Sequence, residues 1–429
     1  MVTTMKEINQ FFERRQVQLG MNFGLSRMET LLTELGDPHK ELKYIHIAGS
    51  NGKGSTLQYI KEILLAQGIR VASFTSPYLI RMNEQLKVNE DEISDQDFID
   101  VFRKLWPIIH EMDSKGNGPT QFEILTAMAF SYFSKKEVDL VLMETGLGGR
   151  LDTTNVIQPF LSIITSISLE HTNILGNTLG EIAFEKAGII KSGAPVISGV
   201  TAGEPAKVIE EKASALGVPY YQLGKDFHVC NMKRSERGQS FSFALADRSI
   251  ENVEMRMLGR HQMENAALAI AAVTVGMENI DEKSILKGIG AAKWDGRFEK
   301  ISDEPLVIID GAHNPAGIDV LKETLKVHYP DYKYRFVFSS FKDKNYSEML
   351  HGLETGAMEI IITEFDHERA ADAKTLYEKC SHPNKSINKD WQAAITEGRR
   401  KTGDKEILVI TGSLQFLSLV REFLIKEDA

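Results

Sequence analysis

The sequence predicts an α/β protein in which two successive series of strands each form a mainly parallel sheet covered by helices. The first observation is that short apolar runs rich in Val and Ile alternate with longer segments of helical period. The second is that residues 227–257 change to alternating stretches such as SFSFAL and VEMRM, which are typical of a small antiparallel meander. The third is that strands separated by helix-length segments resume after the meander. We therefore expect two α/β domains, with the meander in the first.

The expected strands of the first series each end in polar or glycine residues. They cover residues 44–48, 71–75, 140–144, 161–166 and 195–199. Ligands of open α/β sheets bind beyond the carboxyl ends of the strands. We therefore expect the chemistry of this domain at those strand ends.

The second series of expected strands covers residues 306–309, 335–339, 359–363 and 407–411. Before it, two helical segments, HQMENAALAIAAVTVGM and DEKSILKGIGAA, close the first series. The linking segment WDGRFEKIS indicates a domain boundary near residues 293–301. We therefore expect a first domain of residues 1–296 and a second of residues 297–429.

Composition excludes several classes of protein. The chain has 429 residues, 42% of them hydrophobic, which is enough for a substantial core in each domain. A formal charge of -10 argues against nucleic acid as a partner, because proteins that bind phosphate backbones cluster Lys and Arg. The longest uncharged apolar stretch, residues 266–277, is shorter than the ~20 residues of a membrane span, so we expect no membrane partner. Two cysteines and the charged beginning MVTTMKEINQFFERRQ indicate a cytoplasmic protein without a disulfide framework or a signal peptide.

A glycine-rich loop follows the first expected strand, in KYIHIAGSNGKGST at residues 43–56. A strand, such a loop and a helix N-terminus together form a phosphate site, because backbone N–H groups and the helix dipole favour an anion. Here Gly49, Asn51 and Gly52 would supply N–H groups and Lys53 a point charge. The alternative is an ordinary strand-to-helix turn. The candidate nucleotide-binding residues of the loop are Gly49, Ser50, Asn51, Gly52, Lys53, Gly54 and Ser55.

The loop departs from the pattern G-x-x-x-x-G-K-[ST], since Ile47 stands at the first glycine and Gly54 follows the lysine. The hydroxyl that binds magnesium must therefore come from elsewhere. Ser76, just past the second strand in FTSPYL, is a candidate, and a turn-initiating Ser-Pro is the equal alternative. Glu144, which ends a strand before the glycines of ETGLGGRLDTTN, is a second candidate because magnesium prefers oxygen ligands. The alternative is a strand-end acid that caps a helix.

Further strand ends carry reactive groups. LEHTNILG brings Glu170 and His171 to the end of the fourth strand, where His171 could bind metal, although a histidine is more often a core or surface residue. LVIIDGAHNPAG opens the second domain with Asp310, which could bind a ribose or a phosphate-bound water, and His313, which could act in acid–base chemistry. A structural turn is the alternative there. The position of Lys186 in a helical stretch predicts no role by itself.

Taken together, the motifs resemble those of the folylpolyglutamate synthases, including the bifunctional dihydrofolate synthases, within the Mur ligase superfamily. The resemblance spans nearly the whole chain and rests on motifs in the family's order: AGSNGKGST, FTSPYL, ETGLGGRLDTTN, LEHTNILG, EKAGIIK, GRHQMENAA, WDGRFE and IDGAHNP. The family's loop usually begins Gly-Thr-Asn-Gly-Lys, so Ser50 stands in place of a threonine and keeps the hydroxyl.

The resemblance implies an N-terminal P-loop ATPase domain and a C-terminal Rossmann-like domain, with the reaction in the cleft between them. In that reaction ATP phosphorylates the γ-carboxylate of a folate, and the amine of L-glutamate attacks the resulting acyl phosphate. The implied cofactors are ATP and two Mg2+ ions. The implied partners are a folate or dihydropteroate and L-glutamate, and we expect a monomer. Both synthase activities share these motifs, so they leave the dihydrofolate synthase activity open.

The same resemblance implies roles for individual residues. Lys53 matches the phosphate-loop lysine, Lys186 matches a carbamylated lysine, and His313 lies beside the nucleotide as a third catalytic candidate. The implied metal ligands are Ser76, Glu144 and His171. The implied further nucleotide contacts are Asn265, Arg297 and Asp310. Of these, Arg297 would pair with phosphate as the domains close. On the folate side TQFEI resembles a substrate segment, and the candidates are Gln121, Phe122, Arg150 and Asp152.

Two rival functions remain. A Mur-type ligase with another acceptor would use the same loop, glutamate and lysine, but we would expect a further uridine-binding domain before a loop that here starts by residue 49. A nucleotide-dependent switch protein would be expected to carry an Asn-Lys-x-Asp guanine motif, and the nearest string, at residues 388–390, has the wrong spacing. Release of ADP that depends on glutamate would separate a ligase from a switch.

Overall fold

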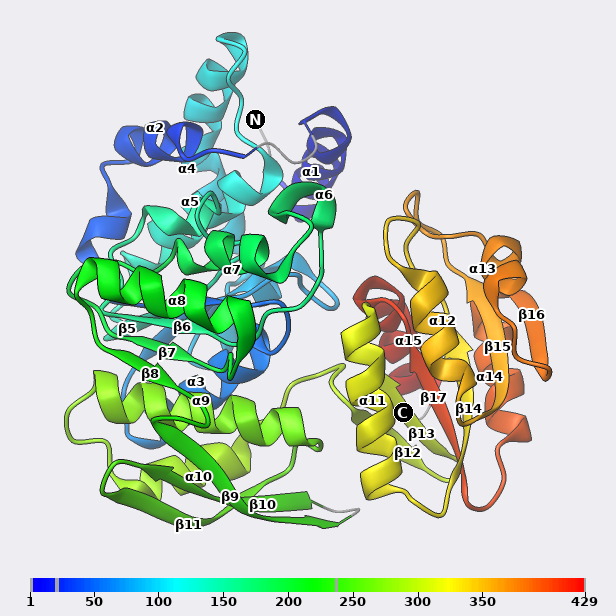
Figure 1. The fold of residues 1–429 in the computed structure, drawn as a ribbon. Helices are drawn as coiled ribbons and strands as arrows, with labels where there is room; N and C mark the ends of the chain where they lie inside the picture. Colours follow the sequence, from blue (N-terminus) through cyan, green and yellow to red (C-terminus); the bar gives the residue numbers. More distant parts are fainter. Residues whose placement is uncertain (1–2, 20–22, 236–237, 428–429) are drawn as a thin grey trace. The chain divides into compact units, whose positions relative to one another are not determined.

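The computed structural model describes residues 3–19, 23–235 and 238–427, and its chain forms two compact units (Figure 1). The first unit contains Met1–Asn231, Phe241–Glu254 and Glu264–Ala292. The second contains Met232–Ser240, Met255–Met263 and Lys293–Ala429. Each unit is built on a mainly parallel sheet, so the expected α/β class is confirmed.

An eight-stranded sheet forms the centre of the first unit, in the order β4-β3-β2-β5-β1-β6-β7-β8. Neighbours from β2 to β8 in this order run parallel, whereas β3 pairs antiparallel with both β2 and β4. The predicted strands are observed as β1, β2, β5, β6 and β7, and β3, β4 and β8 are additional. The bounds are β1 Tyr44–Ala48, β2 Val71–Phe74, β3 Leu86–Val88, β4 Asp91–Glu92, β5 Leu140–Glu144, β6 Leu161–Ile164, β7 Val196–Ser198 and β8 Tyr220–Gln222.

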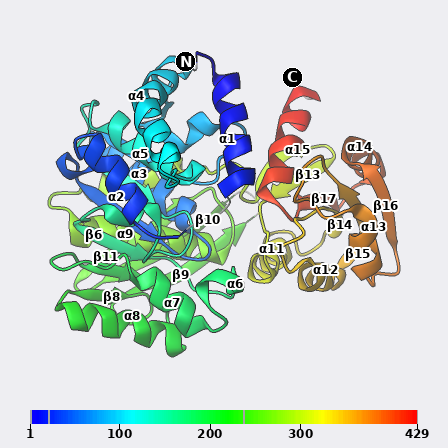
Figure 2. The same ribbon diagram turned by 90° about the horizontal axis from the view of Figure 1, so that it is seen from above.

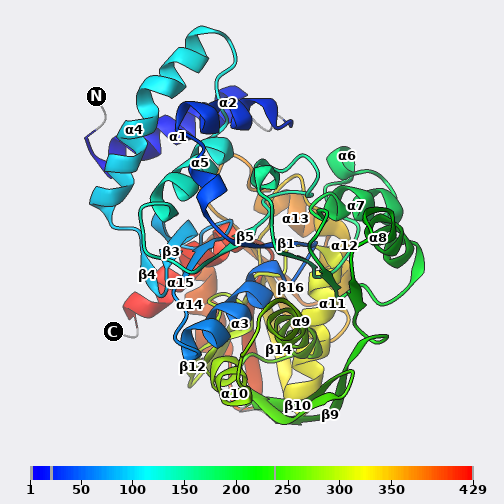
Figure 3. The same cartoon turned by 90° about the vertical axis from the view of Figure 1, so that its left-hand side faces the viewer.

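Helices cover both faces of this sheet. All residues of β1 and β5 are buried, which explains their continuous apolar runs. One face packs on a core that includes Phe12 of α1, Phe102 of α4 and Phe130 of α5, and α3 lies on the opposite face, where it also packs on α10 (Figure 3). The helices are α1 Met5–Leu19, α2 Ser26–Glu34, α3 Lys53–Ala66, α4 Asp95–Ser114, α5 Gln121–Phe133, α6 Thr172–Leu175, α7 Leu179–Ala187, α8 Gly203–Leu216, α9 Arg260–Gly276 and α10 Glu282–Ala291, with 3-10 helices η1 Pro38–Glu41, η2 Met82–Gln85 and η3 Thr153–Val156.

The predicted meander is observed as a three-stranded sheet in the order β11-β10-β9. The strands are β9 Phe227–Ser235, β10 Gly238–Leu245 and β11 Arg248–Met255. Only Ala246 and Asp247 join β10 to β11, and so short a connection joins antiparallel strands. Ala246 has a φ of 50°, the left-handed backbone that such turns require.

A six-stranded sheet forms the centre of the second unit, in the order β12-β13-β17-β14-β15-β16. Its neighbours run parallel except β12 and β13. The predicted strands are observed as β13, β14, β15 and β17. The two edge strands were not predicted, because their charged sequences, EKISD and KSINKD, lack the apolar runs of buried strands. The bounds are β12 Glu299–Asp303, β13 Leu306–Asp310, β14 Lys333–Phe338, β15 Ala357–Glu364, β16 Lys385–Asp390 and β17 Glu406–Thr411.

Helices also lie on both faces of the second sheet (Figure 2). One core contains apolar side chains of α11, α12 and α13, and another contains those of α14 and α15. The helices are α11 Pro315–His328, α12 Tyr346–Glu354, α13 Ala373–Lys379, α14 Trp391–Lys401 and α15 Leu414–Glu427. Within residues 3–19, 23–235 and 238–427, no helix combines the length and the apolar character that crossing a membrane requires.

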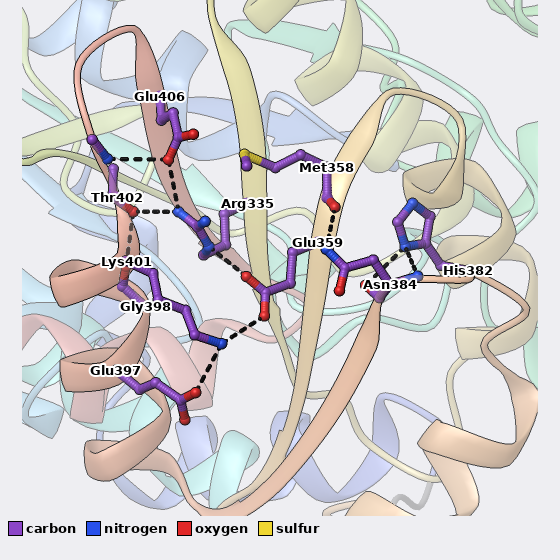
Figure 4. Close-up of polar contacts among 11 residues, drawn as sticks. Arg335, Met358, Glu359, His382, Asn384, Glu397, Gly398, Lys401, Thr402 and Glu406 are labelled. Atoms are coloured by element: carbon purple, nitrogen blue, oxygen red, sulfur yellow. Dashed lines mark hydrogen bonds and ion pairs between the residues drawn. The ribbon is translucent and has the colours of Figure 1, made fainter.

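A buried ionic cluster joins the amino ends of three strands in the second unit (Figure 4). Arg335 of β14 lies 2.6 Å from Glu359 of β15 and 3.2 Å from Glu406 of β17. Lys401 of α14 lies 2.9 Å from the other oxygen of Glu359. The side chains of Arg335 and Glu359 are only 6% and 8% exposed. The cluster therefore fixes the sheet at the edge opposite to the carboxyl ends where ligands bind.

Candidate active site

The glycine-rich loop lies between β1 and α3, as the sequence predicts. A side chain at Gly49 would place its Cβ 1.9 Å from Thr165 Oγ1, and one at Gly52 would place it 2.4 Å from Asn265 Oδ1. Gly52 also has a φ of 87°. Both glycines are therefore needed for close approach of the loop to its neighbours. The structure brings Asn265 of α9 against the loop, although the two are far apart in sequence.

The end of β6 holds the loop from the side. Ser50 N–H donates to the Ser166 carbonyl at 2.8 Å, and Thr165 Oγ1 donates to the Asn51 carbonyl at 2.7 Å. Asn51 N–H, which the sequence assigns to a phosphate, donates to Ser166 Oγ at 3.0 Å. Lys53 Nζ lies 2.9 Å from the carbonyl oxygen of Gly49. A bound phosphate would therefore compete with Ser166 for the Asn51 N–H and with the carbonyl of Gly49 for Lys53.

Lys186 forms a buried ion pair with Glu170 at 2.8 Å, and the two side chains are 2% and 10% exposed. Burial and, to a smaller extent, the charge of Lys53 lower the pKa of Lys186 to about 8, against the attraction of Glu170. Burial would raise the pKa of Glu170, but the charges of Lys186 and Lys53 outweigh it and lower the value to about 2. Two ammonium groups thus act on one carboxylate, Lys186 through direct contact and Lys53 through its charge. The cluster carries an excess positive charge beside the phosphate loop.

Ser76 and Glu144 lie together because β2 and β5 are neighbours in the sheet and end at the same edge. Ser76 N–H donates to Glu144 Oε2 at 3.2 Å. His171 precedes α6 with a φ of 45°. The part of the chain that the structure describes contains no group of three or more His, Cys, Asp or Glu placed to hold a metal. A carboxylate and a hydroxyl nevertheless fit magnesium, which keeps several waters and needs few protein oxygens.

The β5 loop, defined as residues 145–155, packs against the end of α7. A Cβ at Gly149 would lie 2.8 Å from the carbonyl oxygens of Glu185 and Lys186. Arg150 N–H donates to the Glu185 carbonyl at 2.7 Å, and its guanidinium lies 2.9 Å from the Glu185 carboxylate. The structure therefore brings Arg150 next to the helix that carries Lys186.

Of the other residues predicted for the folate side, Asp152 lies in this loop and Phe122 packs on it. Phe122 packs on Gly146, where a Cβ would lie 2.4 Å from the ring, and Gln121 lies 3.9 Å from the sulfur of Met82. Asp152 is buried, and its carboxylate accepts the N–H groups of Leu147 at 2.8 Å and Thr154 at 3.0 Å. Burial raises the pKa of Asp152, against hydrogen bonds that lower it. Asp152 thus organises the loop, and its contact with a substrate stays a prediction.

Three predicted residues of the second unit gather at the end of β13. The carboxylate of Asp310 accepts the N–H groups of Phe298 at 2.8 Å and Ala312 at 2.9 Å. Burial raises its pKa, against the attraction of the Arg297 guanidinium. A Cβ at Gly311 would lie 2.3 Å from Arg297 Nη1, so the guanidinium lies directly over this glycine. His313 Nδ1 lies 2.9 Å from the Gly311 carbonyl oxygen.

Several candidate residues were missed by the sequence interpretation. Glu170, the partner of Lys186, was noted in the sequence but given no role. Its position at a strand end could have identified it as a site residue. A second group consists of buried hydroxyls at the carboxyl ends of β14, β15 and β17 that make no hydrogen bond to the described residues: Ser339, Ser340, Thr363 and Ser413. Unpaired buried hydroxyls at this edge of an α/β sheet indicate a ligand site.

Comparison with known proteins connects this geometry to a family. Residues 47–273 match the family model of the Mur ligase middle domain, and residues 296–414 match that of the Mur ligase glutamate ligase domain. The dihydrofolate synthase/folylpolyglutamate synthase of Bacillus subtilis is 42% identical over 413 residues, which cover 95% of this chain and 96% of the relative.

Solved structures agree with this result. Escherichia coli FolC in complex with DHPP and ADP is 26% identical with a TM-score of 0.91, over 100% of this chain and 99% of that chain. The bifunctional folylpolyglutamate synthase/dihydrofolate synthase of Yersinia pestis, complexed with AMPPNP and a Mn ion, is 26% identical with a TM-score of 0.89, over 99% and 98%. These relatives bind a nucleotide, and one of them also binds a divalent metal ion. The chain therefore belongs to the folylpolyglutamate synthase and dihydrofolate synthase family of the Mur ligases, which are ATP-dependent ligases.

Proposed function

We propose that this enzyme joins L-glutamate to the γ-carboxylate of a reduced folate, using ATP, through an acyl phosphate. The observation that carries this proposal is the cluster of Lys53, Glu170 and Lys186 beside the glycine-rich loop. Such a cluster attracts the phosphates of a nucleotide and the carboxylate that receives one of them. The family of the chain supports the same reaction.

The chemistry explains why ATP is needed. A carboxylate is an anion and a poor electrophile, so an amine does not attack it at a useful rate. Transfer of the γ-phosphoryl group to the carboxylate turns one of its oxygens into part of a good leaving group. The amine of glutamate then attacks the carbonyl carbon, phosphate leaves with that oxygen, and an amide forms. Phosphoryl transfer depends mainly on positioning and on cations beside the phosphates, which is the role proposed for Lys53.

We propose magnesium as the divalent ion, with Ser76, Glu144 and His171 as the residues that hold two ions. When bound, such ions neutralise charge on the phosphate oxygens. Ser76 and Glu144 support the proposal because they lie together at the carboxyl edge of the sheet.

We also propose that Lys186 is carbamylated in the working enzyme. The ammonium first loses a proton; its neutral amine then reacts with carbon dioxide, forming an N–C bond and releasing a second proton, so that a positive charge is replaced by a negative one. The pKa of about 8 favours this reaction, since only the neutral amine is a nucleophile. With Lys53 and Glu170, the cluster would change from one net positive charge to one net negative charge. The unmodified cluster attracts an anion, whereas the modified cluster attracts a metal cation.

In the second unit, we propose that Arg297 and Asp310 contact the nucleotide and that His313 acts beside them. The unpaired hydroxyls at the ends of β14, β15 and β17 are proposed to receive the glutamate. We propose residues 1–296 as the ATP-binding domain and residues 297–429 as the second ligase domain. A monomeric state and a cytoplasmic location stay predictions, and size-exclusion chromatography with light scattering would test the first.

On the folate side, the proposed contacts are Gln121, Phe122, Arg150 and Asp152. Arg150 and Asp152 lie in the β5 loop, and Phe122 of α5 packs on Gly146 of that loop, directly after Gln121 in the sequence. Dihydropteroate is the alternative acceptor, because the family includes both activities.

The test is ADP formation by the purified protein with magnesium and ATP. Tetrahydrofolate plus L-glutamate, dihydropteroate plus L-glutamate, and each component alone are compared. Turnover that requires both a reduced folate and glutamate is the expected result, and turnover with dihydropteroate would add the second activity. Absence of turnover with either pair would overturn the proposal and indicate a Mur-type ligase with another acceptor.

A further inference from the structure

His46 is a buried polar side chain that the proposed mechanism does not use. It lies in β1, two residues before Ala48 ends the strand at the phosphate loop, and 0% of its surface is exposed. Its Nε2 atom lies 2.8 Å from Thr154 Oγ1. Its Nδ1 atom has no hydrogen-bond partner among the described residues. An unpaired buried polar atom in the centre of a sheet is costly, so this histidine needs an explanation.

The other hydrogen bonds of Thr154 show whether His46 Nε2 or Thr154 Oγ1 donates in the bond between them. Thr154 Oγ1 lies 2.5 Å from Asp152 Oδ1, and the same carboxyl group accepts N–H groups from Leu147 and Thr154. A carboxylate that accepts several N–H groups is stabilised in its ionised form. Thr154 therefore gives its hydroxyl proton to Asp152, and His46 donates Nε2–H to Thr154. The reverse direction would leave an N–H of His46 buried without an acceptor, which proteins avoid.

These bonds join β1 to the far end of the β5 loop. Backbone pairing places His46 beside Met143, just before the loop begins. The side chain of His46 adds a contact at Thr154, where the loop returns to the sheet. Between these two points the loop carries Gly146, on which Phe122 packs, and Arg150, which contacts Glu185. Strand pairing holds the start of the loop, and at its end the bond to His46 ties it to β1, beside the contacts of Thr153 with Thr126 at 2.8 Å and of Asn155 with Gly188 at 3.2 Å.

We infer that His46 is a positioning residue that, through Thr154 and Asp152, holds the β5 loop in register with the strand leading into the phosphate loop. The loop then presents its folate-side residues at a fixed place relative to that site. The inference relies on the proposed function for the identity of the ligand. The hydrogen bonds themselves do not depend on it.

Matched variants separate this role from general packing. His46→Asn removes the donor at the Nε2 position, whereas His46→Gln supplies an amide N–H near it. Thr154→Val removes the hydroxyl at nearly constant shape, whereas Thr154→Ser keeps it. Ser131→Ala is the control, because it removes a fully buried hydroxyl of α5 that has no hydrogen-bond partner among the described residues.

The first readout is hydrogen exchange of the amides of Leu147 and Thr154, which needs no substrate. We expect exchange about tenfold or more faster in His46→Asn and Thr154→Val, as for the loss of one or two hydrogen bonds. His46→Gln, Thr154→Ser and Ser131→Ala should exchange like wild type. Nitrogen-15 spectra of labelled histidine should show the Nε2–H tautomer. Unchanged exchange in His46→Asn and Thr154→Val would overturn the inference.

The second readout is kinetic. In His46→Asn and Thr154→Val, kcat/KM for the reduced folate should fall about 10- to 100-fold, as misplaced substrate contacts do. The Kd of ADP should stay close to that of wild type, and His46→Gln and Thr154→Ser should restore the folate kinetics. An equal loss of ADP affinity would show that His46 supports the whole fold and would overturn the inference. If the wild type itself fails to use a folate, the proposed function fails, and hydrogen exchange still decides the role of His46.

Discussion

Removal of carbon dioxide distinguishes two forms of Lys186, the positively charged ammonium and the negatively charged carbamate. Its side chain is 2% exposed, and burial lowers its pKa from 10.5 to about 8 despite the Glu170 carboxylate at 2.8 Å. At pH 7 about one such amine in ten is neutral, compared with about one in three thousand for an ordinary lysine. The reactive form is thus enriched about 300-fold. We expect Lys186 to take up carbon dioxide at neutral pH, whereas exposed lysines do not.

Carbon-13 bicarbonate provides the assay. Wild-type protein should show a carbamate carbon signal, and Lys186→Arg, which keeps the positive charge and has no reactive amine, should not. At a constant concentration of dissolved carbon dioxide, the rate of uptake should rise with pH up to about 8 and level off above it, because the amine is then mostly neutral. Activity should fall in buffer freed of carbon dioxide and return when bicarbonate is added. Absence of label in the wild type, or equal label in Lys186→Arg, would refute the reasoning and leave the ammonium as the working form.

Three further predictions concern other parts of the molecule. Arg297→Ala should reduce turnover about 100-fold with little change in Tm, as for the loss of a group that stabilises the transition state. A large fall in Tm would instead indicate that packing of the Arg297 side chain on Gly311 stabilises the fold. Gly52→Ala should weaken ADP binding about tenfold or more in calorimetry, because the new Cβ would meet Asn265 Oδ1 and the φ of 87° disfavours a side chain. Unchanged ADP affinity would contradict the close approach of Gly52 to Asn265. Glu359→Gln should lower the free energy of unfolding by about 1.5–3 kcal/mol in denaturant titrations at pH 7, since Arg335 loses one of its two carboxylates and keeps that of Glu406. Burial would raise the pKa of Glu359, but hydrogen bonds from Arg335 and Lys401 lower it below 4.5. The stabilisation by Glu359 is therefore present above pH 4.5 and is lost as the pH falls. Glu359→Gln should lack this acid dependence.

The fold could be predicted where strands are buried on both faces. Such strands, β1 and β5 among them, read as continuous apolar runs, and the structure contains them at nearly the predicted residues. The edge strands β12 and β16 could not be predicted, because one side of each faces no neighbouring strand and their sequences are charged. Pairing with β13 and β15 makes them strands, which is a tertiary effect.

The site could be predicted where strand ends and loops lie close in sequence. The glycine-rich loop was visible because its glycines and lysine lie within a few residues. The pairing of Lys186 with Glu170 was not visible, since a helix lies between them and only the folded chain brings a buried lysine to that carboxylate. The same holds for Asn265 against Gly52 and for His46 beside Thr154. Long-range contacts of this kind depend on the order of strands in the sheet, which local patterns do not reveal.

The most direct test of the acyl phosphate follows an oxygen atom. A reduced folate whose γ-carboxylate carries oxygen-18 is turned over with magnesium, ATP and L-glutamate, and the released phosphate is analysed by mass spectrometry. We expect one labelled oxygen in each phosphate released, because the carboxylate oxygen that accepts the phosphoryl group leaves with it. Amide formation with unlabelled phosphate would contradict the account and would mean that ATP is cleaved without activating the folate carboxylate.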